Sequence, residues 1–137
     1  MNPPPLRQPK TLFVLADGGH ARLVERSAET GAFVTFEEMT AADVPHARRG
    51  PAPGLGVDDA TARHDKEAFA AEVSARAMQI CAARGIQRIS VSAPARLVGV
   101  FRIHLARSTL QSEVVERDLA RTPDRALGRW LSHLPSA

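Results

Sequence analysis

Short apolar runs separated by turn residues dominate the first forty positions of the chain. Residues 11–17 form a run rich in strand formers, and the glycine pair 18–19 ends it with residues that permit a tight turn. Residues 20–27 then alternate between apolar and polar positions, a turn follows at 30–31, and residues 32–39 form another alternating run. This pattern predicts an antiparallel meander of three strands.

After this meander the apolar positions change to helical spacing, interrupted by two further strand-like runs. Residues 65–84 predict a helix that Gly85 ends, and residues 87–93 predict a strand. A second helix opens at Pro94, a strand spans 110–119, and a last helix follows Thr122-Pro123-Asp124. The side chains expected to pack in the core from these helices are Phe69, Val73, Ala77, Ile80, Cys81, Leu97, Val98, Phe101, Leu105, Leu127, Trp130, Leu131 and Leu134.

The predicted order of elements is β-β-β-α-β-α-β-α, which describes an α/β domain. Three meandering strands and two right-handed crossovers give a five-stranded mixed sheet with helices on its faces. This order is the one that ribonuclease H-like domains use. We therefore expect residues 11–137 to form a single domain with ribonuclease H-like topology. Residues 1–10 are expected to be a flexible, proline-rich leader, and residues 40–64 a long loop.

The composition agrees with a globular domain and excludes several other classes of protein. The 137 residues are 44% apolar and 24% charged, which excludes a disordered or collagen-like chain. No run approaches the roughly 20 apolar residues that would span a bilayer. The leader lacks the apolar run of a signal peptide, and a single cysteine suits a reducing compartment. We therefore expect a cytoplasmic protein without a membrane partner.

Positive charge is concentrated in the C-terminal part of the chain. The net charge is +3 and the isoelectric point is about 10.0, partly because the sequence has no tyrosine to titrate at high pH. Residues 1–83 carry a balance of −2, whereas residues 84–137 carry +5. Two sets of arginines could form a patch for phosphates or for an acidic partner. These are Arg96, Arg102 and Arg107 on the second helix, and Arg121, Arg125 and Arg129 around the last. A solvated surface is the alternative.

A ribonuclease H-like fold also raises the possibility of metal-dependent hydrolysis. Two-metal chemistry needs several carboxylates that converge on metal sites roughly 4 Å apart, and Asp17, Glu72 and Asp118 are the candidates for such catalytic residues. The fourth strand, however, ends in Ser92-Ala93-Pro94, without an acid. The alternative for Asp17 is a turn residue that accepts backbone hydrogen bonds beside Gly18. The histidines lack the spacing of a zinc site, and we expect no metal and no cofactor.

Three segments resemble the bacterial family of proteins required for attachment to host cells. They are residues 14–23, residues 92–99 and the Glu-Arg-Asp-Leu run at 116–119. The resemblance extends over most of residues 11–134. It departs from the family pattern at Ala95, where a second proline is usual, and at Arg117, where lysine is usual. Arg63 and His64 also fit the family pattern and are counted with Arg96, Arg102 and Arg107 as candidate binding residues.

The family is in turn similar to the middle domain of the archaeal and eukaryotic peptide-chain release factor. In that domain a Gly-Gly-Gln tip in the loop after the third strand promotes hydrolysis of peptidyl-tRNA. The corresponding loop here contains Pro53-Gly54-Leu55-Gly56 and no glutamine, so the resemblance does not imply that chemistry. It implies a non-enzymatic protein with RNA or the ribosome as partner. The alternatives are a metal-dependent phosphoesterase or nuclease centred on Asp17 and a protein–protein assembly or regulatory module.

Overall fold

The computed structural model describes residues 10–41 and 59–131, with the side chains of residues 59–63 excepted. Most of the predicted leader and of the predicted 40–64 loop therefore lies outside the described residues. The described elements, in chain order, are β1 (Thr11–Ala16), β2 (His20–Arg26), β3 (Phe33–Thr40), α1 (Asp59–Arg84), β4 (Arg88–Ala93), α2 (Ala95–Leu105), β5 (Gln111–Glu116), the 3₁₀ helix η3 (Asp124–Ala126) and α3 (Gly128–Leu131).

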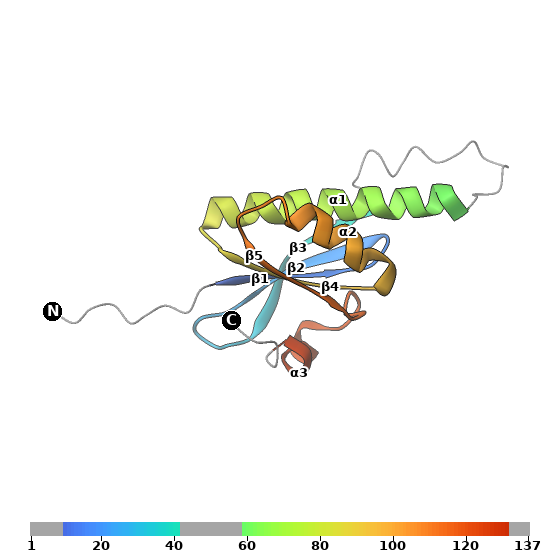
Figure 1. The fold of residues 1–137 in the computed structure, drawn as a ribbon. Helices are drawn as coiled ribbons and strands as arrows, with labels where there is room; N and C mark the ends of the chain where they lie inside the picture. Colours follow the sequence, from blue (N-terminus) through green and yellow to red (C-terminus); the bar gives the residue numbers. More distant parts are fainter. Residues whose placement is uncertain (1–9, 42–58, 132–137) are drawn as a thin grey trace.

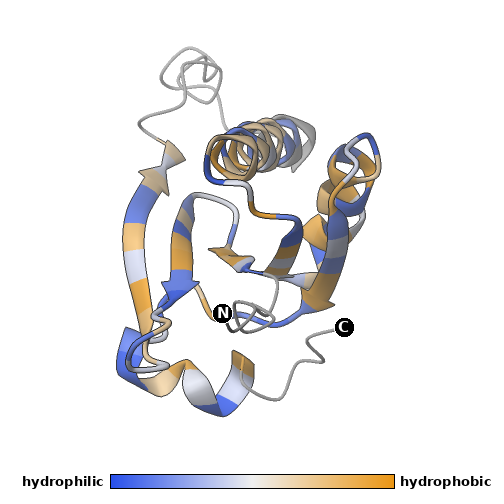
Figure 2. Cartoon of the chain, turned by 90° about the vertical axis from the view of Figure 1, so that its left-hand side faces the viewer, coloured by the Kyte–Doolittle hydropathy of each residue, from blue (hydrophilic) through white to orange (hydrophobic). Residues whose placement is uncertain are grey.

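The strands form one mixed sheet in the order β3-β2-β1-β4-β5. The pairs β1–β2 and β2–β3 are antiparallel, as the predicted meander requires, whereas β4 runs parallel to both β1 and β5. Helices α1 and α2 cover one face of the sheet, and η3 and α3 lie on the opposite face (Figure 1). Figure 2 shows these layers and the alternation of hydrophobic and hydrophilic residues along the strands. The predicted α/β fold with a five-stranded mixed sheet is confirmed.

The larger core lies between the sheet and the two long helices. The predicted stripe of α1, from Phe69 to Cys81, is buried in this core together with Leu97, Phe101 and Leu105 of α2. Gly85 adopts a positive φ of 68°, and the amide of Ile86 donates to the carbonyl of Cys81, which completes the C-terminal end of α1. Burial raises the pKa of the Cys81 thiol to about 11, so this cysteine is an inert core residue, as the sequence predicts.

Helix α1 begins at Asp59, whereas the pattern predicts a start at Asp65. The additional segment, Asp-Ala-Thr-Ala-Arg-His at residues 59–64, contains two alanines and has an acidic residue in its first turn, and both features favour helix. The helix is therefore about 39 Å long at 1.5 Å per residue. No described helix is both long and apolar enough to cross a membrane.

A bulge in β3 aligns that edge strand with α1. The register between β2 and β3 shifts after Leu23, which pairs with Glu37, so Phe36 is the extra residue of the bulge. Arg84 of α1 lies 4.3 Å from the centroid of the Phe36 ring, and Arg76 donates two hydrogen bonds of 2.6 and 2.7 Å to the Glu37 carboxylate. These contacts hold β3 against α1.

Strand β5 is shorter than predicted, because its only neighbour in the sheet ends first. The pattern predicts a strand over 110–119, but β4 stops at Ala93, and the amide of Arg117 donates to the last available carbonyl there. Residues 117–131, which we call the C-terminal strap, then cross under the sheet from β5 to the opposite edge strand β3. Four strand spacings separate these edges, a distance of roughly 19 Å.

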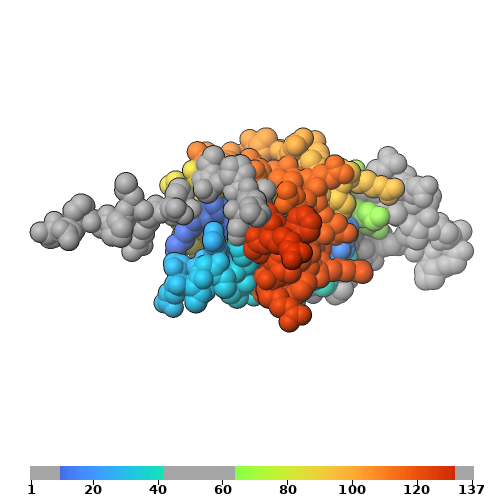
Figure 3. Space-filling view, turned by 90° about the horizontal axis from the view of Figure 1, so that it is seen from below, coloured from blue at the N-terminus to red at the C-terminus, as the bar shows by residue number. Residues whose placement is uncertain are grey.

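The C-terminal strap forms a second, smaller core on the lower face of the sheet. Its side chains Leu119, Leu127 and Leu131 pack against buried residues of the first three strands, which are Phe13, Leu15, Val24 and Phe33. Figure 3 shows this face, with the strap across it in orange and red. The predicted last helix is therefore a 3₁₀ turn followed by a single short helical turn. The prediction that Trp130 is a core residue is wrong, because its side chain is 42% exposed, and Leu134 lies outside the described residues.

Candidate functional site

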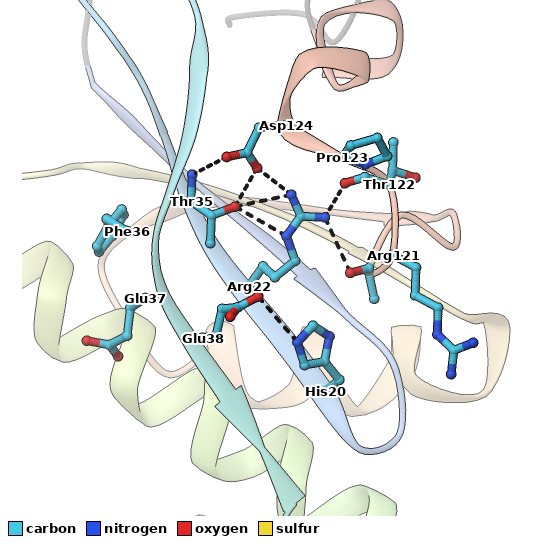
Figure 4. Close-up of a pocket in the computed structure, with 11 residues that line it drawn as sticks. His20, Arg22, Thr35, Phe36, Glu37, Glu38, Arg121, Thr122, Pro123 and Asp124 are labelled. Atoms are coloured by element: carbon cyan, nitrogen blue, oxygen red, sulfur yellow. Dashed lines mark hydrogen bonds and ion pairs between the residues drawn. The ribbon is translucent and has the colours of Figure 1, made fainter.

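An open pocket lies where the C-terminal strap meets the ends of β2 and β3 (Figure 4). Its volume is about 590 Å³. It brings together the start of β2 and the residues after β5, and the first of the three segments that resemble the host-attachment family, residues 14–23, contributes His20 and Arg22 to its lining. The lining residues are His20, Arg22, Thr35, Phe36, Glu37, Glu38, Ala120, Arg121, Thr122, Pro123 and Asp124.

Arg22 is the central residue of this pocket and is almost fully buried. Its side chain is 8% exposed, and its Nη2 atom forms an ion pair with Oδ1 of Asp124. Its Nη1 atom donates to the carbonyl oxygens of Leu119, Ala120 and Thr122 in the strap. The strap supplies the acceptors of Nη1 and one acceptor of Nη2, whereas Thr35 of β3 accepts from Nε and Nη2, so Arg22 connects the strap to the sheet.

Asp124 and Thr35 complete this network. The backbone amide of Thr35 donates to Oδ2 of Asp124 at 3.0 Å, and the Thr35 hydroxyl donates to Oδ1. Burial by itself raises the pKa of Asp124, but the hydrogen bonds from Thr35 and Arg22 outweigh that effect and hold the pKa below its ordinary value. Asp124 therefore satisfies a backbone donor of the edge strand β3 as well as the buried charge of Arg22.

The exposed polar groups of the pocket surround this network. The Nε2 atom of His20 lies 3.6 Å from Oε1 of Glu38, and both side chains are accessible. The Arg121 guanidinium points away from Arg22 (Figure 4). Arg22 already uses its donors on Asp124, Thr35 and the strap, so the pocket has a structural network at its base and no unpaired buried charge.

The three carboxylates considered for catalysis have different surroundings. Asp17 lies in the turn after β1, where its Oδ1 atom accepts the amides of Gly19 and His20 at 2.8 and 2.7 Å. Glu72 is partly buried on α1, and Asp118 is exposed after β5. Within residues 10–41 and 64–131, no group of three or more His, Cys, Asp or Glu side chains is placed to hold a metal ion. The interpretation of Asp17 as a turn residue is confirmed.

The turn role of Asp17 leads to a prediction about its side chain. Asp17→Ala is expected to lower the free energy of unfolding by about 1–2 kcal/mol, because two backbone amides lose their acceptor. Asp17→Asn is the matched control, since its carbonyl oxygen accepts the same bonds and should retain most of the stability. Urea unfolding followed by far-UV circular dichroism measures both. Equal losses in the two variants would contradict the turn role.

Gly18, the residue after Asp17, lies close to the Lys66 side chain of α1. A Cβ atom at Gly18 would lie 2.9 Å from the side-chain carbons of Lys66. Glycine at this position therefore lets the Lys66 side chain cross the hairpin.

The arginines predicted to bind a partner occupy two opposite sides of the molecule. Arg96 and Arg102 are exposed on α2, and Arg107 is exposed in the turn that follows. The second set, Arg121, Arg125 and Arg129, is exposed on the strap, below the sheet. His64 is exposed on α1, and the side chain of Arg63 lies outside the described residues. The two sets therefore belong to elements on opposite faces of the sheet, and their role in binding a partner stays a prediction.

Sequence reasoning did not identify Arg22, Thr35 and Asp124 as a functional group of residues. A signal was nevertheless available at Arg22, because the alternation of residues 20–27 places it on the same face as Val24. An arginine that shares a face with a core residue must find acceptors there. Its main partner lies 102 positions later in the chain, and no local pattern indicates a contact across that distance.

One of three comparisons with known proteins, the comparison with family profiles, supports the resemblance to the host-attachment family. A solved structure of the Aquifex aeolicus Ppx/GppA phosphatase, type II variant, aligns with a TM-score of 0.44 and 10% identity over 77% of this chain. The alignment covers 35% of that phosphatase, so this chain spans about a third of its length. No curated protein matches the sequence significantly. The sequence profile of the family described as "Protein required for attachment to host cells" matches residues 12–131. The chain therefore belongs to the family of proteins required for attachment to host cells.

Proposed function

We propose that this member of the host-attachment family is a non-enzymatic RNA-binding protein that contacts RNA phosphates through the arginines of α2. The observation that supports this proposal is the surface made by Arg96, Arg102 and Arg107, which are all exposed. Helix α2 itself contains no acidic residue to neutralise them. Arginine is suited to phosphates, because its planar guanidinium can donate two parallel hydrogen bonds to them.

The spacing of these arginines suits an extended polyanion. Arg96 lies in the first turn of α2 and Arg102 in its last, six residues or about 9 Å further along the helix axis at 1.5 Å per residue. The Nη2 atom of Arg102 is 3.5 Å from the carbonyl oxygen of Val114 in β5. Arg107 lies beyond the end of α2, in the turn that follows. The three charges are thus distributed along α2 and the turn after it, and are not gathered at a single point.

Topology gives secondary support for RNA as the partner. We propose that the fold is ribonuclease H-like, on the basis of the strand order β3-β2-β1-β4-β5 with β4 and β5 parallel to β1. The sequence resemblance to the release-factor middle domain adds structured RNA or the ribosome as the expected partner. The loop that would carry the Gly-Gly-Gln tip lies outside the described residues, and its sequence has no glutamine between residues 50 and 58.

The non-enzymatic part of the proposal depends on the carboxylates. Asp17 uses its oxygen on the turn amides, and the described carboxylates do not gather into a group of three. A phosphoesterase with Asp17 at its centre would have to bind a metal through Oδ2, because Oδ1 accepts the turn amides. The experiment that tests RNA binding therefore also tests for metal-dependent cleavage of the RNA.

A titration with structured RNA tests this proposal. A labelled RNA hairpin is titrated with the full chain at two salt concentrations, with and without Mg²⁺ or Mn²⁺. Binding is expected to weaken steeply with salt, because each phosphate contact releases counterions. The variant with Arg96, Arg102 and Arg107 all changed to alanine should bind more weakly, and the slope of log K against log salt should fall by about two to three.

A second triple variant is the matched control for this titration. Changing Arg121, Arg125 and Arg129 to alanine removes the same charge from the opposite side of the sheet and should leave most of the RNA affinity. No binding of the native chain at low salt would contradict the proposal, as would equal losses in the two variants. Metal-dependent cleavage that Asp17→Asn abolishes would instead establish the phosphoesterase.

A further inference from the structure

The outward surface of the C-terminal strap combines exposed arginines with the single tryptophan of the chain. We propose that this surface, made by Arg121, Arg125, Arg129 and Trp130, is a docking site for an acidic segment of a protein partner. Its location below the sheet is separate from α2, so the inference goes beyond the proposed RNA contact (Figure 1). The four side chains are exposed and belong to one continuous stretch of ten residues, 121–130.

Charge is the first argument for an acidic partner. Arg121, Arg125 and Arg129 recur every four residues, and none of them forms an ion pair in the described part of the chain. Of the two acids in the strap, Asp124 has its carboxylate engaged by Arg22 and Thr35, and Asp118 is exposed before the stretch 121–130 begins. The stretch 121–130 therefore carries three exposed arginines and a single acid that is already paired, and carboxylates on a partner would complement its charge.

The second argument is the position of Trp130. Its neighbours Leu127 and Leu131 are buried in the lower core, but the indole is 42% exposed. The Arg117 guanidinium lies 5.6 Å from the ring centroid, and its Nη1 atom donates to the Trp130 carbonyl at 3.0 Å. The Arg117 guanidinium thus lies over the ring, while part of the ring stays accessible to a partner. Exposed tryptophan and arginine are the residue types that contribute most at protein interfaces.

The same geometry favours a polypeptide over single-stranded RNA. Arg117 lies over one face of the Trp130 ring, so a base could stack only on the other face. An apolar side chain of a peptide needs only contact with the exposed part of the ring. Carboxylates can also accept two parallel hydrogen bonds from each arginine. We therefore assign the strap surface to a segment that alternates acidic and apolar side chains.

Contacts with the sheet hold the strap in a defined position, as a binding surface requires. Arg22 holds three of its carbonyl groups and Asp124, and the buried leucines hold its far end. A partner would therefore meet an ordered surface and would not have to fold the strap on binding.

Trp130 provides a direct reporter for the test, because it is the sole tryptophan. The full chain is titrated with a labelled ten-residue peptide of glutamates and two leucines, and in parallel with a labelled uridine decanucleotide. Indole fluorescence and the anisotropy of the label are both measured. We expect the peptide to change the Trp130 emission. Changing Arg121, Arg125 and Arg129 to alanine should weaken peptide binding about tenfold, since three exposed ion pairs are lost.

The α2 triple variant is now the matched control, because it removes three charges from the other side of the molecule. It should bind the peptide like the native chain. Trp130→Leu, followed by anisotropy, should weaken the peptide while circular dichroism shows an intact fold. The proposal is overturned if the peptide does not bind, if the two triple variants lose equal affinity, or if the decanucleotide binds the strap surface more tightly than the peptide. None of these results depends on whether α2 binds RNA.

Discussion

Replacing Arg22 with methionine is expected to lower the free energy of unfolding by about 3 kcal/mol, which is a large fraction of the stability of a domain of this size. The change removes the donor to three strap carbonyls and leaves Asp124 without its cation. This loss of stability lies at the lower end of the range for breaking a buried ion pair, because Asp124 is 38% exposed and water reaches its carboxylate.

A double variant separates the effect of leaving the Asp124 carboxylate unpaired from the effect of losing the other contacts of Arg22. Arg22→Met combined with Asp124→Leu should recover part of the loss, because no unpaired charge then remains on the lower face. Guanidinium unfolding of the four proteins in the cycle gives the coupling free energy between the two sites. A coupling close to zero would show that the ion pair does not fasten the strap.

The dependence of stability on pH provides an independent control for the same contact. The pKa of Asp124 lies below its ordinary value in the folded chain, so its contribution to stability is complete above the ordinary aspartate pKa of about 3.8. That contribution is lost as the pH falls toward the lower, folded pKa, because the unfolded chain then binds the proton first. Arg22→Met should therefore differ most from the native chain at neutral pH, and the difference should shrink below pH 4. The Glu37 pKa is also lowered, by hydrogen bonds from Arg76, but that contribution is common to both proteins.

The second large effect is expected in the upper core. Phe69→Ala should lower the free energy of unfolding by about 3–5 kcal/mol, because the Phe69 ring is fully buried between α1 and the sheet and leaves a cavity when removed. The measurement is urea unfolding followed by far-UV circular dichroism, which reports on the whole helix. Trp130 fluorescence reports on the lower core in the same experiment.

Glu67→Ala is the matched control for Phe69→Ala, since Glu67 is exposed on the same helix and alanine favours helix. It should change the stability by less than about 0.5 kcal/mol. If Phe69→Ala were as mild as this control, the upper core would not depend on α1 as the structure indicates. Coincident transitions by circular dichroism and by Trp130 fluorescence would show that the two cores unfold together.

Much of the fold could be predicted from the sequence, because its signals are local. The apolar stripe of α1 from Phe69 to Cys81 and the alternation of the first strands follow from helix and strand periods of 3.6 and 2 residues. Gly85 and the turn at Asp17 depend on backbone conformation at a few neighbouring residues. The predicted start of α1 was wrong by less than two turns, since acidic residues at both Asp59 and Asp65 can begin a helix.

The candidate sites could be predicted only in part. The exposure of Arg96, Arg102 and Arg107 follows from their place off the apolar stripe of α2, and the structure agrees. Trp130 was expected in the core, because apolar spacing predicts which residues share a face but not how much of that face another element covers. The last helical turn is short, so it buries its leucines and leaves the indole outside.

The sequence by itself determined the order of the elements, the α/β class and the buried stripes of the long helices, because hydrophobic period and turn chemistry act between near neighbours. Only the tertiary structure decided the course of the C-terminal strap, the pairing of Arg22 with Asp124 and the separation of the two arginine sets. These features depend on which groups meet across the sheet. Strand β5 ends where its partner β4 stops offering hydrogen bonds, and the buried arginine on β2 then finds its acceptors in the segment that crosses beneath it.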